Sequence, residues 1–229
     1  MTAKGLIAFV MTVFCAFSSG AFEHPEDWFE IREIGDDVFT RIQGKSYKDN
    51  CKVPLDDLRY LTIAYVDFDG NVQKGELICN EAIASDLLEI FRQLYLQEYP
   101  LESVRLIDEF DADDVKSMQA NNTSCFNYRE IAGTNKLSNH ALGLAIDINP
   151  LYNPWVKEKE GKISVSPEEG RPYADRSKPL PHKIDENDPC YQLFKAYGFT
   201  WGGSWNSPKD YQHFEKKIAK EAGWYPGNL

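Results

Sequence analysis

The chain has 229 residues, of which 25 are Lys or Arg and 36 are Asp or Glu, so its formal net charge is −11. This length is enough for one domain with a sizeable core. A surface this acidic repels phosphate backbones, and the chain has no cluster of basic residues with interleaved aromatics. We therefore exclude nucleic acid as a partner.

Residues 1–21 have the features of an export signal. Lys4 supplies a positive charge, residues 6–17 are apolar, and Ser19-Gly20-Ala21 offers small residues for cleavage. The apolar run is too short to span a bilayer comfortably, and no second run follows it. An uncleaved anchor is the alternative. We expect an exported protein, secreted, periplasmic or associated with the cell wall, with no transmembrane span after cleavage.

Four cysteines follow the signal: Cys51, Cys79, Cys125 and Cys190. An even number in an exported protein permits two disulfides, whose pairing the sequence does not determine. The absence of a C-x-x-C pair argues against a four-cysteine zinc site. Buried, unpaired cysteines that pack as small apolar residues are the alternative.

The first half of the chain predicts a leader, a hairpin and a helix. Residues 22–50 are polar and irregular, which indicates a leader segment ahead of a domain over 51–229. Residues 60–68 and 72–79 are rich in β-branched and aromatic residues and flank Asp69-Gly70-Asn71, a hairpin pattern. Asn80 can cap the helix that follows. Residues 103–110 are typical of another strand.

The second half mixes further elements with a long loop. The acidic run 108–114 lacks the EF-hand spacing and is expected to be a solvated turn. Residues 150–187 are rich in Pro, Gly and charge, which predicts a loop and, at this length, a substrate-facing flap. Asp188 and Pro189 then begin a helix that ends before Gly198. Strands and helices are mixed without a repeating βαβ pattern, so we predict an α+β fold: one compact domain with a small antiparallel sheet flanked by helices.

One expected strand carries an unusual carboxylate. In residues 144–149, LAIDIN, the three large apolar side chains point to one face and Asp147 points to the other. An ionised carboxylate in the middle of a strand requires a cation or several donors. Gly143 allows the backbone to turn, so that His140 can lie on the same side as Asp147.

A second polar cluster, residues 210–215, follows near the C-terminus. If it is a strand, Tyr211, His213 and Glu215 share a face, with Asp210 at its entrance. His140, Asp147 and His213 then make a three-ligand zinc set with a fourth position for water, and Asp210 is a base for that water. Spacing alone also permits a purely structural interpretation. The remaining two histidines, His24 and His182, are expected to be surface residues.

The motif around His140 and Asp147 and the motif around His213 together resemble those of a known family. S138-x-H140-x-x-G143-x-A145-x-D147, followed by W201-G202-G203 and D210-x-x-H213-F214, is similar to the zinc D-alanyl-D-alanine carboxypeptidases and L-alanyl-D-glutamate endopeptidases. Bacterial cell-wall enzymes and phage endolysins belong to this family, and it shares its fold with the hedgehog signalling domain. In motif terms the resemblance covers roughly residues 100–216.

The resemblance implies a function and roles for particular residues. It implies Zn²⁺ held by His140, Asp147 and His213, with Asp210 as the catalytic base. Many relatives carry Glu at the base position, and Asp looks more like the endolysin branch. Arg129 matches an arginine that binds the substrate carboxylate or polarises its carbonyl; a surface salt bridge is the alternative.

Two further residues are expected to contact substrate: Ser138 in the first motif and Trp201, although a core position is the alternative for Trp201. Tyr211 and Glu215 are either partners that orient His213 or ordinary strand residues.

The predicted function is a secreted zinc metallopeptidase that hydrolyses an amide bond in the peptidoglycan stem peptide. Whether it acts as a D-alanyl-D-alanine carboxypeptidase or an L-alanyl-D-glutamate endopeptidase stays open, as does the oligomeric state. The first alternative is an inactive, zinc-containing binding module of the hedgehog type. The second is a non-haem iron oxygenase, whose first ligand pair is usually spaced H-x-D rather than seven residues apart.

Overall fold

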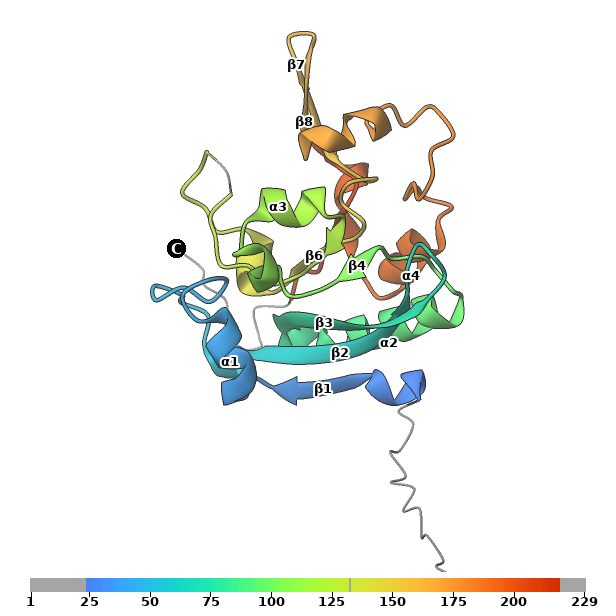
Figure 1. The fold of residues 1–229 in the computed structure, drawn as a ribbon. Helices are drawn as coiled ribbons and strands as arrows, with labels where there is room; N and C mark the ends of the chain where they lie inside the picture. Colours follow the sequence, from blue (N-terminus) through green and yellow to red (C-terminus); the bar gives the residue numbers. More distant parts are fainter. Residues whose placement is uncertain (1–23, 132, 219–229) are drawn as a thin grey trace, which may run out of the picture.

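A computed structural model describes residues 24–131 and 133–218 (Figure 1). It is a single compact domain of the α+β class, with small antiparallel sheets and short helices, as the sequence predicts. The expected export signal, residues 1–21, lies outside the described residues. Among the described helices, none is both long and apolar enough to span a bilayer.

The largest strands form the expected hairpin. β2 (Leu58–Val66) and β3 (Val72–Asn80) pair in antiparallel register from Leu58↔Asn80 to Val66↔Val72. Asp67 closes the turn by accepting the backbone N–H groups of Asp69 and Asn71, as a short side chain does in an Asx turn. Nearly all of β2 is buried, so this strand forms the centre of the core.

Helix α2 (Glu81–Leu96) begins directly after β3. The Asn80 side chain accepts the backbone N–H of Ala82, which confirms the predicted N-cap. One face of the helix is buried, and Figure 1 shows it lying along the sheet formed by β2 and β3. The apolar residues of this face are Ile83, Ala84, Leu87, Ile90, Phe91 and Leu94.

The prediction of an irregular leader over residues 22–50 is wrong. A 3₁₀ turn, η1 (Pro25–Trp28), leads into β1 (Glu30–Glu33), which pairs antiparallel with β2, and α1 (Asp36–Ile42) buries Val38 and Ile42 completely. The segment is polar because β1 is an edge strand and α1 is short, so each buries few side chains. The fold therefore begins before residue 51.

The predicted strand over residues 103–110 is mostly a turn. Only β4 (Ser103–Val104) is extended; it pairs in parallel with β5 (Asn122–Thr123). The 3₁₀ turn η3 (Ile107–Phe110) follows, and α3 (Asp114–Gln119) begins after Asp113, whose side chain caps it. The acidic run 108–114 is thus a turn, as expected, but it leads into a helix that was not predicted, and Asp108 is buried rather than solvated.

Three strands from the second half form the sheet that carries the polar clusters. β6 (Ala145–Asp147) pairs antiparallel with β11 (His213–Glu215), which also pairs with β9 (Thr200–Trp201). The 3₁₀ turn η4 (Asn139–Leu142) precedes β6, and the 3₁₀ turn η6 (Gly202–Ser204) follows β9. The predicted helix is α4 (Pro189–Ala196), capped by Asp188.

The expected loop over residues 150–187 contains a hairpin that sequence periodicity did not indicate. β7 (Trp155–Lys159) and β8 (Lys162–Ser166) project away from the body of the domain (Figure 1), and the 3₁₀ turn η5 (Glu168–Tyr173) follows. Glu160 and Gly161 both have positive φ, as a two-residue hairpin turn requires. The short strand β10 (Lys209–Asp210) pairs with β7. The hairpin is therefore anchored next to Asp210.

Cys51, Cys79, Cys125 and Cys190 are all unpaired in this structure. Cys79, Cys125 and Cys190 are buried, and burial raises the pKa of each thiol well above its usual value, so they remain neutral at physiological pH. They pack as small apolar side chains, which matches the alternative to disulfides.

Candidate metal centre

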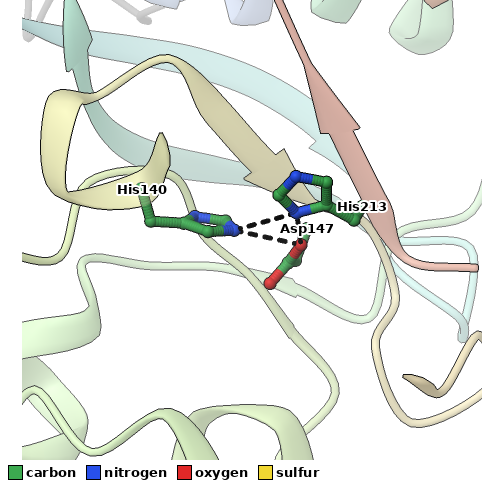
Figure 2. Close-up of side chains that lie close together, drawn as sticks. All are labelled: His140, Asp147 and His213. Atoms are coloured by element: carbon green, nitrogen blue, oxygen red, sulfur yellow. Dashed lines mark hydrogen bonds and ion pairs between the residues drawn. The ribbon is translucent and has the colours of Figure 1, made fainter. Parts of the chain in front are cut away.

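The pairing of β6 with β11 brings together three side chains that are far apart in the sequence. His213 lies directly opposite Asp147 in the antiparallel register, and η4 places His140 beside them (Figure 2). His140 Nε2, His213 Nδ1 and Asp147 Oδ1 point toward one another. Their three separations are 3.2 Å (Nε2–Nδ1), 3.1 Å (Nδ1–Oδ1) and 3.2 Å (Nε2–Oδ1). The structure thus groups the three residues that the sequence predicted as metal ligands.

Gly143 makes the turn between His140 and β6. It ends η4 with φ +67°, a left-handed conformation that favours glycine, as predicted. A side chain here would also be blocked, because a Cβ atom would lie 2.6 Å from the backbone N of Asn80. At the same contact, the backbone N–H of Asn80 donates a hydrogen bond to the Gly143 carbonyl. The turn that positions His140 is therefore fixed to the end of β3.

In each histidine, the ring nitrogen that faces away from the cluster forms a hydrogen bond with a protein acceptor. That bond fixes which nitrogen carries the hydrogen and which nitrogen is free to bind a metal. His140 Nδ1 lies 2.7 Å from the carbonyl oxygen of Cys125, which can only accept, so Nδ1 carries the hydrogen and Nε2 presents a lone pair. His213 Nε2 lies 3.2 Å from Oε2 of Glu215, an acceptor when ionised, so its Nδ1 is the ligating atom. Such outer hydrogen bonds orient histidine ligands in metal sites.

Asn139 positions the Glu215 carboxylate that accepts the hydrogen bond from His213. Its side-chain amide donates to Glu215 Oε2 at 2.5 Å, so one oxygen accepts from both Asn139 and His213. The hydrogen bond with His213 lowers the pKa of Glu215 despite its partial burial, so the carboxylate is ionised at neutral pH. This supports the prediction that Glu215 orients His213; Asn139 and the Cys125 carbonyl were not foreseen, because only the folded backbone brings them near the histidines.

The electrostatics of the cluster favour a cation between the three donor atoms. Burial by itself lowers the pKa of His213, but the hydrogen bonds with Asp147 and Glu215 and the nearby carboxylates raise it to about 10. Burial acts against ionisation of Asp147, yet His140 and His213 hold its pKa well below its usual range. In the metal-free protein a proton on His213 therefore supplies the positive charge that the donor set requires.

The spacing of the donor atoms fits zinc. Two ligands at the usual Zn–N and Zn–O distances lie roughly 3.3 Å apart at the edge of a tetrahedron. The three observed separations are 3.1–3.2 Å. Two imidazoles and one carboxylate also form the ligand chemistry of catalytic zinc sites, which keep a fourth position open.

Asp210 lies in electrostatic contact with this cluster. Burial raises its pKa to about 6, with Asp147 adding to the increase and His213 opposing it. Its Oδ1 accepts a hydrogen bond from Gln212 Nε2 at 3.2 Å, which leaves Oδ2 available to take a proton. A carboxyl group whose pKa approaches neutrality has the properties of a general base.

The two glycines after Trp201 are required for close packing within the protein. A Cβ on Gly202 would lie 2.5 Å from the carbonyl oxygen of Asp210, and one on Gly203 would overlap the Trp201 ring. Trp201 itself is buried in the core, and its indole N–H donates to the Tyr211 carbonyl at 2.9 Å. The core position given as the alternative for Trp201 is thus the one observed. Trp205, which was not predicted, lies closer to the cluster, with its ring 5.4 Å from that of His213.

The other residues singled out in the sequence lie outside the three-residue cluster and have local contacts. Ser138 caps η4: its hydroxyl accepts the backbone N–H of His140 at 3.2 Å. The Arg129 guanidinium forms an ion pair through Nε with Asp114, while its carbonyl accepts the Ser138 backbone N–H. His182 stacks on Phe68 with ring centroids 3.7 Å apart, and His24 precedes η1. Neither of these two histidines joins the cluster.

Comparison with known proteins agrees with this geometry. A sequence profile of the family described as D-alanyl-D-alanine carboxypeptidase matches residues 132–216, the segment that contains all three clustered side chains and Asp210. The match confirms the resemblance predicted from the motifs and supports a peptidase. Searches of curated proteins and of solved structures found no match.

Gly143→Ala is predicted to destabilise the protein. The left-handed conformation costs an L-residue about 1 kcal/mol, and the clash with Asn80 adds to it. Gly161→Ala is the matched control, because Gly161 has φ +75° and open space around its Cβ position. Thermal unfolding of both variants is the measurement. Equal losses in Tm would contradict the proposed close contact.

Glu215→Ala is predicted to weaken zinc binding by roughly 10- to 100-fold, the usual effect of losing a partner that orients a ligating histidine. Glu215→Gln retains an acceptor oxygen for His213 Nε2 and is expected to keep most of the affinity. Competition with a chelator of known affinity measures both. Unchanged affinity in Glu215→Ala would show that His213 needs no such support.

Proposed function

We propose that this chain, whose residues 132–216 match the D-alanyl-D-alanine carboxypeptidase family, is an exported zinc peptidase that hydrolyses an amide bond in the peptidoglycan stem peptide. The observation that carries the proposal is the convergence of His140 Nε2, His213 Nδ1 and Asp147 Oδ1 beside Asp210. A purely structural zinc site needs no base next to it, so Asp210 favours catalysis over the binding-module alternative.

His140, Asp147 and His213 would hold the metal. When bound, zinc supplies Lewis-acid chemistry: it polarises a carbonyl group and makes water acidic near pH 7. The chain prepares the site by fixing both histidine tautomers through Cys125 and Glu215. Because His213 carries a proton in the metal-free protein, zinc uptake is expected to release it.

Asp210 acts as the general base and then as the general acid. Its Oδ2 accepts a proton from the attacking water while Gln212 holds Oδ1, and it returns the proton to the leaving amine. The raised pKa of Asp210, about 6, suits both transfers near neutral pH. Gly202 allows the backbone of Asp210 to pack close to η6, which holds the carboxylate near the cluster.

The substrate is expected to lie at the metal centre, flanked by Arg129 and by the β7–β8 hairpin. Arg129, held at Nε by Asp114, is proposed to bind the substrate's carboxylate or polarise its carbonyl. Ser138 contributes by holding the start of η4, and through it His140. The β7–β8 hairpin, whose strand β7 pairs with the Asp210 strand β10, is proposed to serve as the substrate-facing flap.

Export follows from the sequence of residues 1–21, with cleavage near Ala21. The substrate lies outside the cytoplasm, so an exported enzyme meets it directly.

Zinc binding depends on the clustered residues in this proposal. His140→Ala is predicted to abolish stoichiometric zinc, because the remaining two donors cannot hold the ion. His182→Ala, which removes a histidine outside the cluster, should keep one zinc per chain. Elemental analysis of the purified variants checks this. Loss of zinc in both variants, or Fe(II) in the wild type, would contradict the ligand assignment.

Asp210→Asn is predicted to retain zinc and lose at least 100-fold in turnover, roughly the contribution of a general base. Because the base must be ionised, wild-type activity should fall as the pH drops through the pKa of Asp210, which is about 6 in the metal-free protein and lower when zinc is bound. The measurements are metal content and kcat. A variant that keeps wild-type turnover would assign the proton transfer to another group.

The bond that is cut can be identified by mass spectrometry of purified peptidoglycan after digestion. New N-terminal D-Glu would show an L-alanyl-D-glutamate endopeptidase, and free D-Ala would show a D-alanyl-D-alanine carboxypeptidase. Intact muropeptides in the presence of zinc-loaded protein would overturn the proposed activity and favour a binding module.

A further inference from the structure

A cavity of about 420 Å³ lies next to the segment that supports the metal centre. Its walls come from two parts of the chain: residues 48–52, which precede the family match, and residues 128–130, 135 and 137. The lining residues are Lys48, Asn50, Lys52, Tyr128, Arg129, Glu130, Asn135 and Leu137. It therefore combines three cations and two amides with a single carboxylate.

This charge pattern is exceptional in a chain of net charge −11. Neither Lys48 nor Lys52 has a carboxylate within 4 Å among residues 24–131 and 133–218, and both side chains belong to exposed residues. Arg129 is partly neutralised by Asp114. The larger cavity beside the β7–β8 hairpin, about 760 Å³, is different, because three cations and three carboxylates line it.

The lysine-bearing segment is held firmly in place. Both oxygens of the buried Asp108 carboxylate accept from Ser46, from its backbone N–H at 3.0 Å and its hydroxyl at 2.9 Å. The Ser46 carbonyl in turn accepts the Tyr128 backbone N–H. The Tyr47 hydroxyl donates to the Val53 carbonyl, and the Cys51 N–H closes a turn onto Lys48. A site held in this way requires little ordering when a ligand binds.

The cavity is also continuous with the support of the metal centre. Cys125, whose carbonyl fixes His140, lies on the same segment as Tyr128 and Arg129. Backbone hydrogen bonds join this segment to η4, from Asn127 N–H to the His140 carbonyl and from Ser138 N–H to the Arg129 carbonyl. The segment that forms one wall of the cavity is therefore also the segment that orients His140.

We infer that Lys48 and Lys52, with Arg129, form a binding site for an anionic group, a carboxylate or a phosphate, of the cell-wall polymer. The identity of the polymer depends on the proposed function, whereas the preference for an anion depends only on the cavity. The site supplies a local attraction for anions on a protein of net charge −11. The field of a surface charge extends only about 10 Å at 0.1 M salt, so distant carboxylates do little to oppose this attraction.

The test measures binding in the Asp210→Asn background, in which hydrolysis of a probe is expected to be at least 100-fold slower. The probes are the peptide L-Ala-γ-D-Glu-L-Lys, its analogue with the glutamate carboxylate amidated, and polyglycerol phosphate, each titrated in low salt by NMR. Lys48→Gln/Lys52→Gln is the variant. Arg92→Gln/Lys195→Gln is the control: it removes the same charge from residues of α2 and α4 that line neither cavity.

A roughly threefold to tenfold loss of peptide affinity in the Lys48/Lys52 variant is expected, as for two exposed charge contacts. The control and the amidated analogue should show no such loss. The same loss for polyglycerol phosphate instead would identify phosphate as the source of the anionic group. Equal affinities in variant and control for both anionic probes would overturn the inference. Hydrolysis by the wild type is scored separately: anion binding without hydrolysis would refute the peptidase and leave the cavity site intact.

Discussion

Three lone-pair atoms, two imidazole nitrogens and a carboxylate oxygen, lie 3.1–3.2 Å apart in a nearly closed site. Such an arrangement is unfavourable without a positive charge at its centre. In the metal-free protein a proton on His213 meets this requirement, and the proposed zinc ion would replace it. The acceptors behind the rings, the Cys125 carbonyl and Glu215, prevent either histidine from turning its lone pair away.

The fold is arranged around this requirement. The β6–β11 register sets Asp147 opposite His213, and the left-handed turn at Gly143 returns the chain so that His140 faces them. Glycines at 202 and 203 allow Asp210 and Trp201 to pack tightly on the other side. Each of these positions tolerates few alternatives, for steric reasons, so the spacing of the two sequence motifs reflects the geometry of one site.

Local signals in the sequence predicted the hairpin of β2 and β3, the caps at Asn80 and Asp188, and the three clustered side chains. Features that depend on long-range pairing were missed. The sequence of β1 is too polar to be recognised as a strand, because the strand depends on its pairing with β2. The β7–β8 hairpin is largely exposed, so it lacks hydrophobic alternation. The contacts of Asn139 and Trp205 arise only when distant segments meet.

X-ray absorption at the zinc K-edge of the purified, zinc-loaded protein tests the converging donor set most directly. The arrangement of His140, Asp147 and His213 predicts only nitrogen and oxygen neighbours, at about 2.0–2.2 Å. It also predicts the outer scattering of two imidazole rings. Sulfur neighbours at about 2.3 Å, a single imidazole, or six oxygen neighbours as in hydrated zinc would contradict it.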